Sequence, residues 1–191
     1  MKKTVFVFSA FILAAVLAAV VDVASKKMVF DMLQCSVTDK GIVYKDGRVV
    51  QHINVNIPSD FRPHFTIIKG FFEIVPVLNR GGMWGFLFGK TFALILFSGA
   101  CIGIIGIMAI KVKERKFATR VALALILGGA LGNLYDRLAM GGVRDFLDFD
   151  LGFIHWATFN LADVWIVLGV MLIFALEFVF PKKKRESEDA H

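Results

Sequence analysis

Two aspartates in the C-terminal half of the chain, Asp145 and Asp163, are candidate reacting groups. Each lies in a short polar motif, VRDF at 143–146 and FNLAD at 159–163, and a long apolar run leaves the second motif. A charged side chain at the edge of hydrocarbon is costly, so it is a functional-site hypothesis by default. The pattern therefore singles out two candidate reacting groups.

The chemistry open to such a pair depends on whether the two carboxyl groups meet. Two carboxylates in a poorly hydrated site cannot both be charged at low cost, so they share a proton and their pKa values split. One then acts as a base on water while the other donates a proton to a peptide carbonyl oxygen. The alternative is that the two are paired separately with Arg137 or Arg144, or that they cap helices. The residues alone leave both possibilities open.

The elements that position these groups are predicted to cross a membrane. Of the 191 residues, 57% are hydrophobic, and the mean hydropathy is +0.69, whereas soluble domains are about 45–50% apolar by a broader count. The net charge is +6, but the basic residues gather beside apolar runs, so nucleic acid is not an expected partner. Cys35 and Cys101 lie in unlike settings and no histidine pair has zinc-ligand spacing, so we expect no metal and no cofactor.

Four apolar runs are predicted as spans, at about 4–22, 91–110, 118–135 and 160–180. A bilayer core about 30 Å thick needs roughly 20 residues of helix. The first run is interpreted as a retained span that ends at Asp22. The rival is a cleaved signal peptide, whose apolar part is usually shorter, at about 7–15 residues. Basic residues flank alternate ends of the runs, which predicts that both termini are cytoplasmic.

The segment between the first two spans differs from them in composition. The dipeptide Asp46-Gly47 lies between β-prone runs and predicts a hairpin; residues 53–57 and 71–78 are predicted as further strands. Residues 136–158 are expected at the outer surface, with the apolar residues between Phe146 and Trp156 forming an interfacial helix or loop. The predicted fold class is an all-α integral membrane protein with four transmembrane helices and a small extracytoplasmic β-rich element at about 35–85, in one domain over 1–191.

Small residues at helical spacing predict where the spans pack closely. Gly99 and Gly103 form a GxxxG pair in the second span, and Gly128 and Gly132 give a small-residue face to the third. Such pairs let helix backbones approach.

Taken together, the polar motifs resemble one known family, the lipoprotein signal peptidases (signal peptidase II). The motifs are DVASK at 22–26, LNRGGMWG at 78–85, GNLYDR at 132–137, VRDF and FNLAD. The resemblance implies an intramembrane aspartic endopeptidase of the bacterial inner membrane. It would remove the signal peptide from diacylglyceryl-modified prolipoproteins by cutting before the lipidated cysteine, at the extracytoplasmic face. The implied partners are this lipidated substrate and membrane lipid, and we expect a monomer.

The resemblance also assigns roles to individual residues. Asp145 and Asp163 would be the catalytic dyad. Five further polar residues would orient the dyad or bind the substrate: Asp22, Asn79, Asn133, Arg137 and Asn160. Asn133 and Arg137 are i and i+4, so a helix presents them on one face, whereas Asn160 could equally be a plain helix N-cap.

The chain departs from the family pattern at Arg144, where an apolar residue is commoner, at Met83-Trp84, and in the length of its outer insertion. We expect Asp136 to anchor a helix end. The rival functions are a small proton-coupled transporter and a lipid-binding scaffold. The transporter is disfavoured because no internal repeat is visible and because the acidic residues gather at one face.

Overall fold

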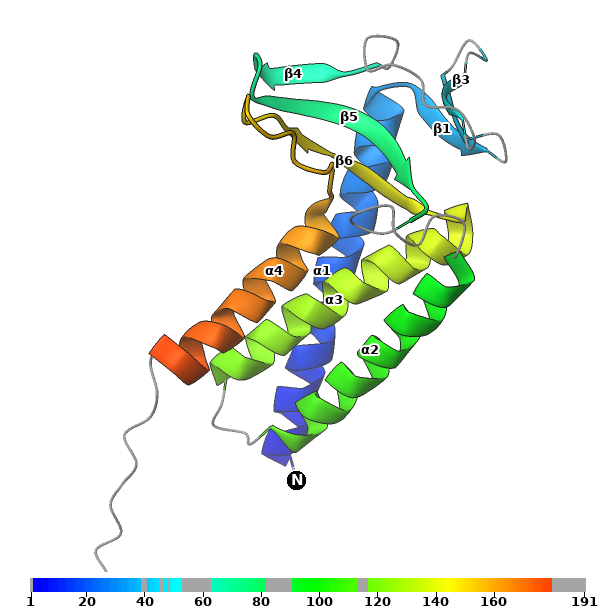
Figure 1. Ribbon diagram of the computed structural model, residues 1–191. Coiled ribbons are helices and arrows are strands. Elements are labelled where there is room, and N and C mark those ends of the chain that lie inside the picture. The colour runs from blue at the N-terminus through cyan, green and yellow to red at the C-terminus, as the bar shows by residue number, and fades with distance from the viewer. Residues whose placement is uncertain are drawn as a thin grey trace, which may run out of the picture.

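Four long helices run side by side, and two small sheets lie across one end of them (Figure 1). The computed structural model describes residues 2–38, 41–44, 47, 49–52, 63–81, 91–112 and 117–179. Its helices are α1 (Lys2–Met32), α2 (Thr91–Lys111), α3 (Phe117–Met140) and α4 (Leu161–Phe174), the last continued by a π-helical turn at Ala175–Val179. Its strands are β1 (Cys35–Thr38), β2 (Gly41–Tyr44), β3 (Val49–His52), β4 (Phe65–Ile68), β5 (Phe72–Asn79) and β6 (Val143–Phe149).

The helices have the length and surface of membrane spans. Four segments are long and apolar enough to cross a bilayer: Val7–Met32, Thr91–Lys111, Phe117–Met140 and Leu161–Val179. The third helix, α3, contacts each of the other three. The outer helices expose large apolar side chains such as Leu17, Phe97 and Val170, as surfaces that face lipid do. The predicted fold class, a mostly helical membrane protein with a small β-rich part, is confirmed.

The first helix does not end at Asp22, contrary to the expectation. It continues to Met32 because Asp22 and Lys26, one turn apart, neutralise each other on a buried face, with Nζ 2.6 Å from Oδ2. Beyond that pair, Val29 and Phe30 are buried. The last turns of α1 therefore serve as packing surface for the sheets.

Close helix packing occurs at Gly128 and Gly132 of α3 as predicted, but not at Gly99 and Gly103 of α2 among the described residues. A Cβ added at Gly128 would collide with Ala18 of α1, and one at Gly132 would collide with the Asp22 carboxylate. By contrast, a Cβ at Gly99 or Gly103 would meet nothing within 4 Å among the described residues. The GxxxG pair of α2 thus has no described helix against it.

Both sheets are three-stranded and antiparallel, in the orders β1-β2-β3 and β4-β5-β6. The predicted hairpin is present as β2 and β3, and Gly47 between them has φ 84°. The strand expected at 71–78 is β5, while the one expected at 53–57 and Met83-Trp84 lie outside the described residues.

The expectation of an interfacial helix or loop between Phe146 and Trp156 is wrong for residues 146–149, which lie in a strand, whereas residues 151–154 form neither helix nor strand. Residues up to Met140 extend α3, and Val143–Phe149 form β6, which pairs with β5. Aromatic residues favour this pairing: the Phe72 and Phe149 rings stack with centroids 4.3 Å apart, a cross-strand contact that stabilises sheets.

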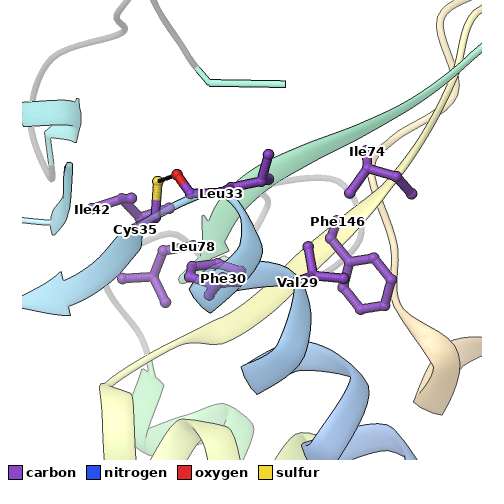
Figure 2. Packing of buried hydrophobic residues seen from close by; sticks show 8 residues of the cluster. All are labelled: Val29, Phe30, Leu33, Cys35, Ile42, Ile74, Leu78 and Phe146. Atoms are coloured by element: carbon purple, nitrogen blue, oxygen red, sulfur yellow. Dashed lines mark hydrogen bonds between the residues drawn. The ribbon is translucent and has the colours of Figure 1, made fainter. Parts of the chain in front are cut away.

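A compact apolar cluster joins the sheets to the helices. Figure 2 shows its eight buried residues, which come from the end of α1, from β1, β2, β5 and β6, and from the α1–β1 turn: Val29, Phe30, Leu33, Cys35, Ile42, Ile74, Leu78 and Phe146. Because β6 is part of this cluster, the strand is held firmly over the helix ends.

Candidate active site

Asp145 enters the site from β6. The register pairs Asn79 with Val143 and Val77 with Asp145, so the end of β5 runs beside the carboxyl group. Asn79 Nδ2 donates to Asp145 Oδ2 at 3.0 Å. Side chains alternate along a strand, so Asp145 and its neighbour Arg144 leave β6 in opposite directions. Asp145 is only 2% exposed.

Asp163 enters from the first turn of α4, where Asn160 is the N-cap. Asn160 Oδ1 accepts from the Asp163 backbone N–H at 3.2 Å, and Asp163 Oδ2 accepts from the Asn160 backbone N–H at 3.3 Å, so the two form a capping box. The Asn160 side chain also donates from Nδ2 to Asp145 Oδ1 at 2.5 Å. The residue is thus both an N-cap and a direct link between the two carboxyl groups.

A second amide side chain, that of Asn133 in α3, contacts Asp163. Its Nδ2 donates to Asp163 Oδ1 at 2.9 Å, and its Oδ1 accepts from Lys26 Nζ at 3.0 Å and from Asn160 Nδ2 at 3.2 Å. An ammonium group only donates hydrogen bonds, so the Asn133 amide must present its oxygen to Lys26. The NH₂ group of Asn133 is therefore directed to Asp163.

The two carboxyl groups open onto one cavity of about 400 Å³. Asn79, Asn133 and Arg137 supply the rest of its polar lining. The apolar lining comes from the β6–α4 connection and the outward face of α4, and includes Trp156, Phe159, Val164, Val167 and Leu168. Asn133 and Arg137 share the cavity, as their i, i+4 spacing predicted. Arg137 Nη1 lies 3.4 Å from its own helix's Asn133 carbonyl and 3.5 Å from Ser98 Oγ, and its Nε has no protein partner in the described region.

Burial and charge set the protonation of Asp145. Removal from water, and next the negative charge of Asp163, raise the pKa of Asp145 to about 7; donation from Asn160 and Asn79 and the charge of Lys26 oppose the rise. A carboxyl group with such a pKa is protonated half of the time near neutral pH. Within the described ranges neither Asp145 nor Asp163 forms an ion pair, and no three His, Cys, Asp or Glu side chains converge as metal ligands would.

Asp22 lies behind the cavity and does not line it. Its Oδ1 accepts from the Ala162 backbone N–H at 2.8 Å, and its Oδ2 contacts Lys26. Asp22 thus braces the first turn of α4, which carries Asp163, and is fully buried.

Three buried charged residues behind the cavity were not predicted as part of the site: Lys26, Asp136 and Arg144. Arg144 donates to Asp136, from Nη2 to Oδ1 at 2.7 Å and from Nε to Oδ2 at 3.1 Å. This removes the possibility that Arg144 neutralises Asp145. The spacing of Asp22 and Lys26, i and i+4, was a usable signal for the first pair, whereas the Arg144 contact joins two elements and has no local signature.

The sequence matches a family model described as signal peptidase (SPase) II over residues 42–179. A lipoprotein signal peptidase of Yersinia pseudotuberculosis is 42% identical over 145 residues, which cover 71% of this chain and 86% of the relative. One of Desulfitobacterium hafniense is 42% identical over 152 residues, covering 78% and 95%.

The fold matches solved structures as well. A structure described as a bacterial membrane enzyme superposes with a TM-score of 0.71 at 25% identity and covers 95% of each chain. A second structure with the same description has a TM-score of 0.62 at 26% identity, covering 88% of this chain and 92% of the other.

Proposed function

We propose that this chain, which belongs to the signal peptidase II family, hydrolyses its substrate with Asp145 and Asp163 as the catalytic pair. The protein is a membrane endopeptidase that removes signal peptides from lipoprotein precursors. One observation carries the residue assignment. Asn160 contacts both carboxyl groups, through its side chain to Asp145 and through its backbone N–H to Asp163, at the edge of one cavity.

The two acids have environments suited to different roles. Asp163 stands in the first turn of α4 and accepts two N–H groups, and the positive end of a helix favours negative charge. Asp145 is the more buried of the two and carries the raised pKa. We assign Asp163 as the base that takes a proton from water, and Asp145 as the acid that donates to the peptide carbonyl oxygen.

The reaction then balances without another reactant. The water oxygen bonds to the carbonyl carbon as its proton moves to Asp163, and the Asp145 proton moves to the carbonyl oxygen. The resulting tetrahedral diol collapses when the amide nitrogen takes the proton held by Asp163 and the C–N bond breaks. A hydroxyl proton returns to Asp145, which restores the starting state of the pair.

The supporting residues divide into two groups. Asn79, Asn133 and Asn160 hold the carboxyl groups by the contacts described above. Arg137 lines the same cavity, and among the described residues its donors have long hydrogen bonds or no partner, so we assign it to a substrate carbonyl or head-group oxygen. Asp22 acts one layer behind, by bracing α4.

The cavity lining supports a lipid-anchored peptide as substrate. Val164, Val167 and Leu168 follow α4 into its membrane-spanning part, and Val167 and Leu168 are exposed. The cavity therefore reaches the surface that faces lipid, and we propose that a diacylglyceryl-modified precursor enters from the bilayer and is cut before its lipidated cysteine.

The residues at the two ends of the helix bundle support one orientation of the protein in the membrane. The sheets and the start of α4 lie at one end of the bundle, while the N-terminal end of α1 and the C-terminal end of α2 lie at the other (Figure 1). The last residue of α2 is Lys111, and the first residues of the chain include Lys2 and Lys3. Basic flanks favour the cytoplasmic side. We propose that this bacterial membrane enzyme acts at the extracytoplasmic face of the inner membrane, with both termini cytoplasmic. We further propose a single-domain monomer that needs no cofactor and binds no nucleic acid.

Cleavage of a lipidated precursor peptide by the purified chain tests the assignment. We expect Asp145→Asn and Asp163→Asn each to abolish turnover, because neither amide can take or give the required proton. Asp150→Asn is the matched control, since Asp150 is exposed, follows β6, and has a carboxylate that accepts from the Gly152 N–H. Thermal unfolding in detergent checks that each variant is folded. A near wild-type rate in either dyad variant would refute the assignment.

A further inference from the structure

A buried layer of alternating charges lies directly behind the proposed catalytic pair. It contains two anionic side chains, Asp22 of α1 and Asp136 of α3, and two cationic ones, Lys26 of α1 and Arg144 of β6. Each is 7% exposed or less. The charges sum to zero only when Arg144 is present. Because an uncompensated charge in such a place is strongly destabilising, the contribution of Arg144 is electrostatic as well as geometric.

Lys26 is the member of this layer that contacts the active site. Its ammonium group has three donors; it lies 2.6 Å from Asp22 Oδ2, 3.0 Å from Asn133 Oδ1 and 3.7 Å from Asp136 Oδ2. The first two are hydrogen bonds and the third is a longer ion-pair contact. The position of Lys26 is therefore a balance between Asn133 and Asp136.

Arg144 sets that balance by occupying Asp136. Both carboxylate oxygens of Asp136 accept from the Arg144 guanidinium, and Oδ2 also accepts from the Arg144 backbone N–H at 2.9 Å. The guanidinium lies over the Phe30 ring, 6.0 Å from its centroid. With its oxygens engaged in this way, Asp136 has little capacity left to draw Lys26 from Asn133.

We propose that Arg144 is a positioning residue: by neutralising Asp136 it keeps Lys26 on Asn133, and so keeps the Asn133 NH₂ group on Asp163. The inference rests on the proposed role of Asp163. It assigns to Arg144 an effect on turnover that reaches the reacting carboxylate through three side chains, although Arg144 itself does not line the cavity.

The rival explanation is that the ion pair only ties β6 to α3. Two variants separate the explanations. Arg144→Met removes the cation and leaves Asp136 charged, whereas Arg144→Met combined with Asp136→Asn also removes the anion. Neither variant restores the tie between the elements, but the double variant removes the excess charge that would draw Lys26 away.

The measurement is kcat and KM for a lipidated precursor peptide, with thermal unfolding of each purified variant. We expect R144M to lower kcat roughly ten- to a hundredfold, the size of loss that a displacement of about 1 Å can cause, with KM changed less than threefold. We expect the double variant to recover at least half of that loss on a logarithmic scale. Arg144→Lys keeps the charge without the two-pronged contact and should stay within about threefold of wild type.

Arg120→Met is the matched control, because Arg120 is an equally buried arginine at the other end of α3 that donates to the Val112 carbonyl. It should change stability and leave kcat unchanged. The proposal is refuted if folded R144M has wild-type kcat, or if the double variant is no faster than R144M. If R144M does not fold, R144K and the double variant decide: a loss of kcat of more than tenfold in either folded variant refutes the proposal. All of these outcomes differ from failure of the catalytic assignment, which appears as turnover by Asp163→Asn.

Discussion

Replacing Asn79 by alanine tests the electrostatics of Asp145 through the pH dependence of turnover. With its pKa at about 7, Asp145 is about nine-tenths protonated at pH 6 and about one-tenth protonated at pH 8. If Asp145 is the acid, kcat falls as the pH rises through about 7 and decreases roughly tenfold per unit well above it. Because the two acids are coupled, the measured midpoint is a property of the pair.

The direction of the change in Asn79→Ala follows from which protonation state the amide favours. Its donation to Oδ2 at 3.0 Å stabilises the ionised form of Asp145 and so lowers the pKa. Removing the donor raises the pKa, and the acid form persists to higher pH. A hydrogen bond to a charged group contributes about 1.5–3 kcal/mol, and one pKa unit corresponds to about 1.4 kcal/mol. With water replacing part of the contact, we expect an upward movement of about one unit.

The assay is kcat for a lipidated precursor peptide between pH 5.5 and 9. Asn79→Ala should have a lower maximum than wild type, because the carboxyl group is held less firmly, yet retain a larger share of that maximum at pH 8. Thr66→Ala is the control, since Thr66 donates to the exposed Glu73 carboxylate in the same sheet. A folded Asn79→Ala variant whose alkaline limb stays in place or moves to lower pH would show that Asp145 does not control it.

Two further predictions concern stability. Gly132→Ala should destabilise the protein and reduce turnover, because its Cβ would overlap the Asp22 carboxylate that braces α4. Gly99→Ala should be neutral or stabilising, because no described atom lies within 4 Å of the added Cβ and alanine favours a helix. Thermal unfolding of both variants in one detergent measures the difference, and equal effects would contradict the packing described for α3. Asp145 has a folded-state pKa of about 7 and an unfolded one near 4, so the unfolded state binds fewer protons between these values and stability should fall as the pH rises from about 4 to 7. Asp145→Asn should flatten that slope in unfolding experiments, and an unchanged slope would place its origin elsewhere.

Local pattern was sufficient to predict the parts of the fold that one segment determines. Apolar runs of membrane-spanning length predicted the four helices, and Asp46-Gly47 predicted the β2–β3 hairpin. Spacing also predicted that Asn133 and Arg137 share a face, and both line the cavity. In each case the signal lies within a few residues of the structure that it specifies.

Contacts between distant segments set the features that the sequence did not reveal. The strand β6 forms because β5, more than sixty residues earlier, offers it an edge and an aromatic partner. Likewise the end of α1 at Met32 depends on a sheet that buries Val29 and Phe30. The glycines of α2 show the converse: Gly99 and Gly103 have the spacing of a packing motif, but no described atom lies within 4 Å of a Cβ built at either one.

The amide groups of the polar site have fixed orientations, which follow from the donors and acceptors around them. Lys26 can only donate, and an ionised Asp163 can only accept, so the amide between them, Asn133, has one orientation that satisfies both. The Asp163 backbone N–H fixes Asn160 in the same way: it requires Oδ1 and thereby leaves Nδ2 for Asp145. Each of the two carboxyl groups, Asp145 and Asp163, thus receives an amide N–H whose orientation is fixed by the surrounding protein. A charge change at Arg144 or Lys26 should therefore alter the chemistry more than its distance from the cavity suggests.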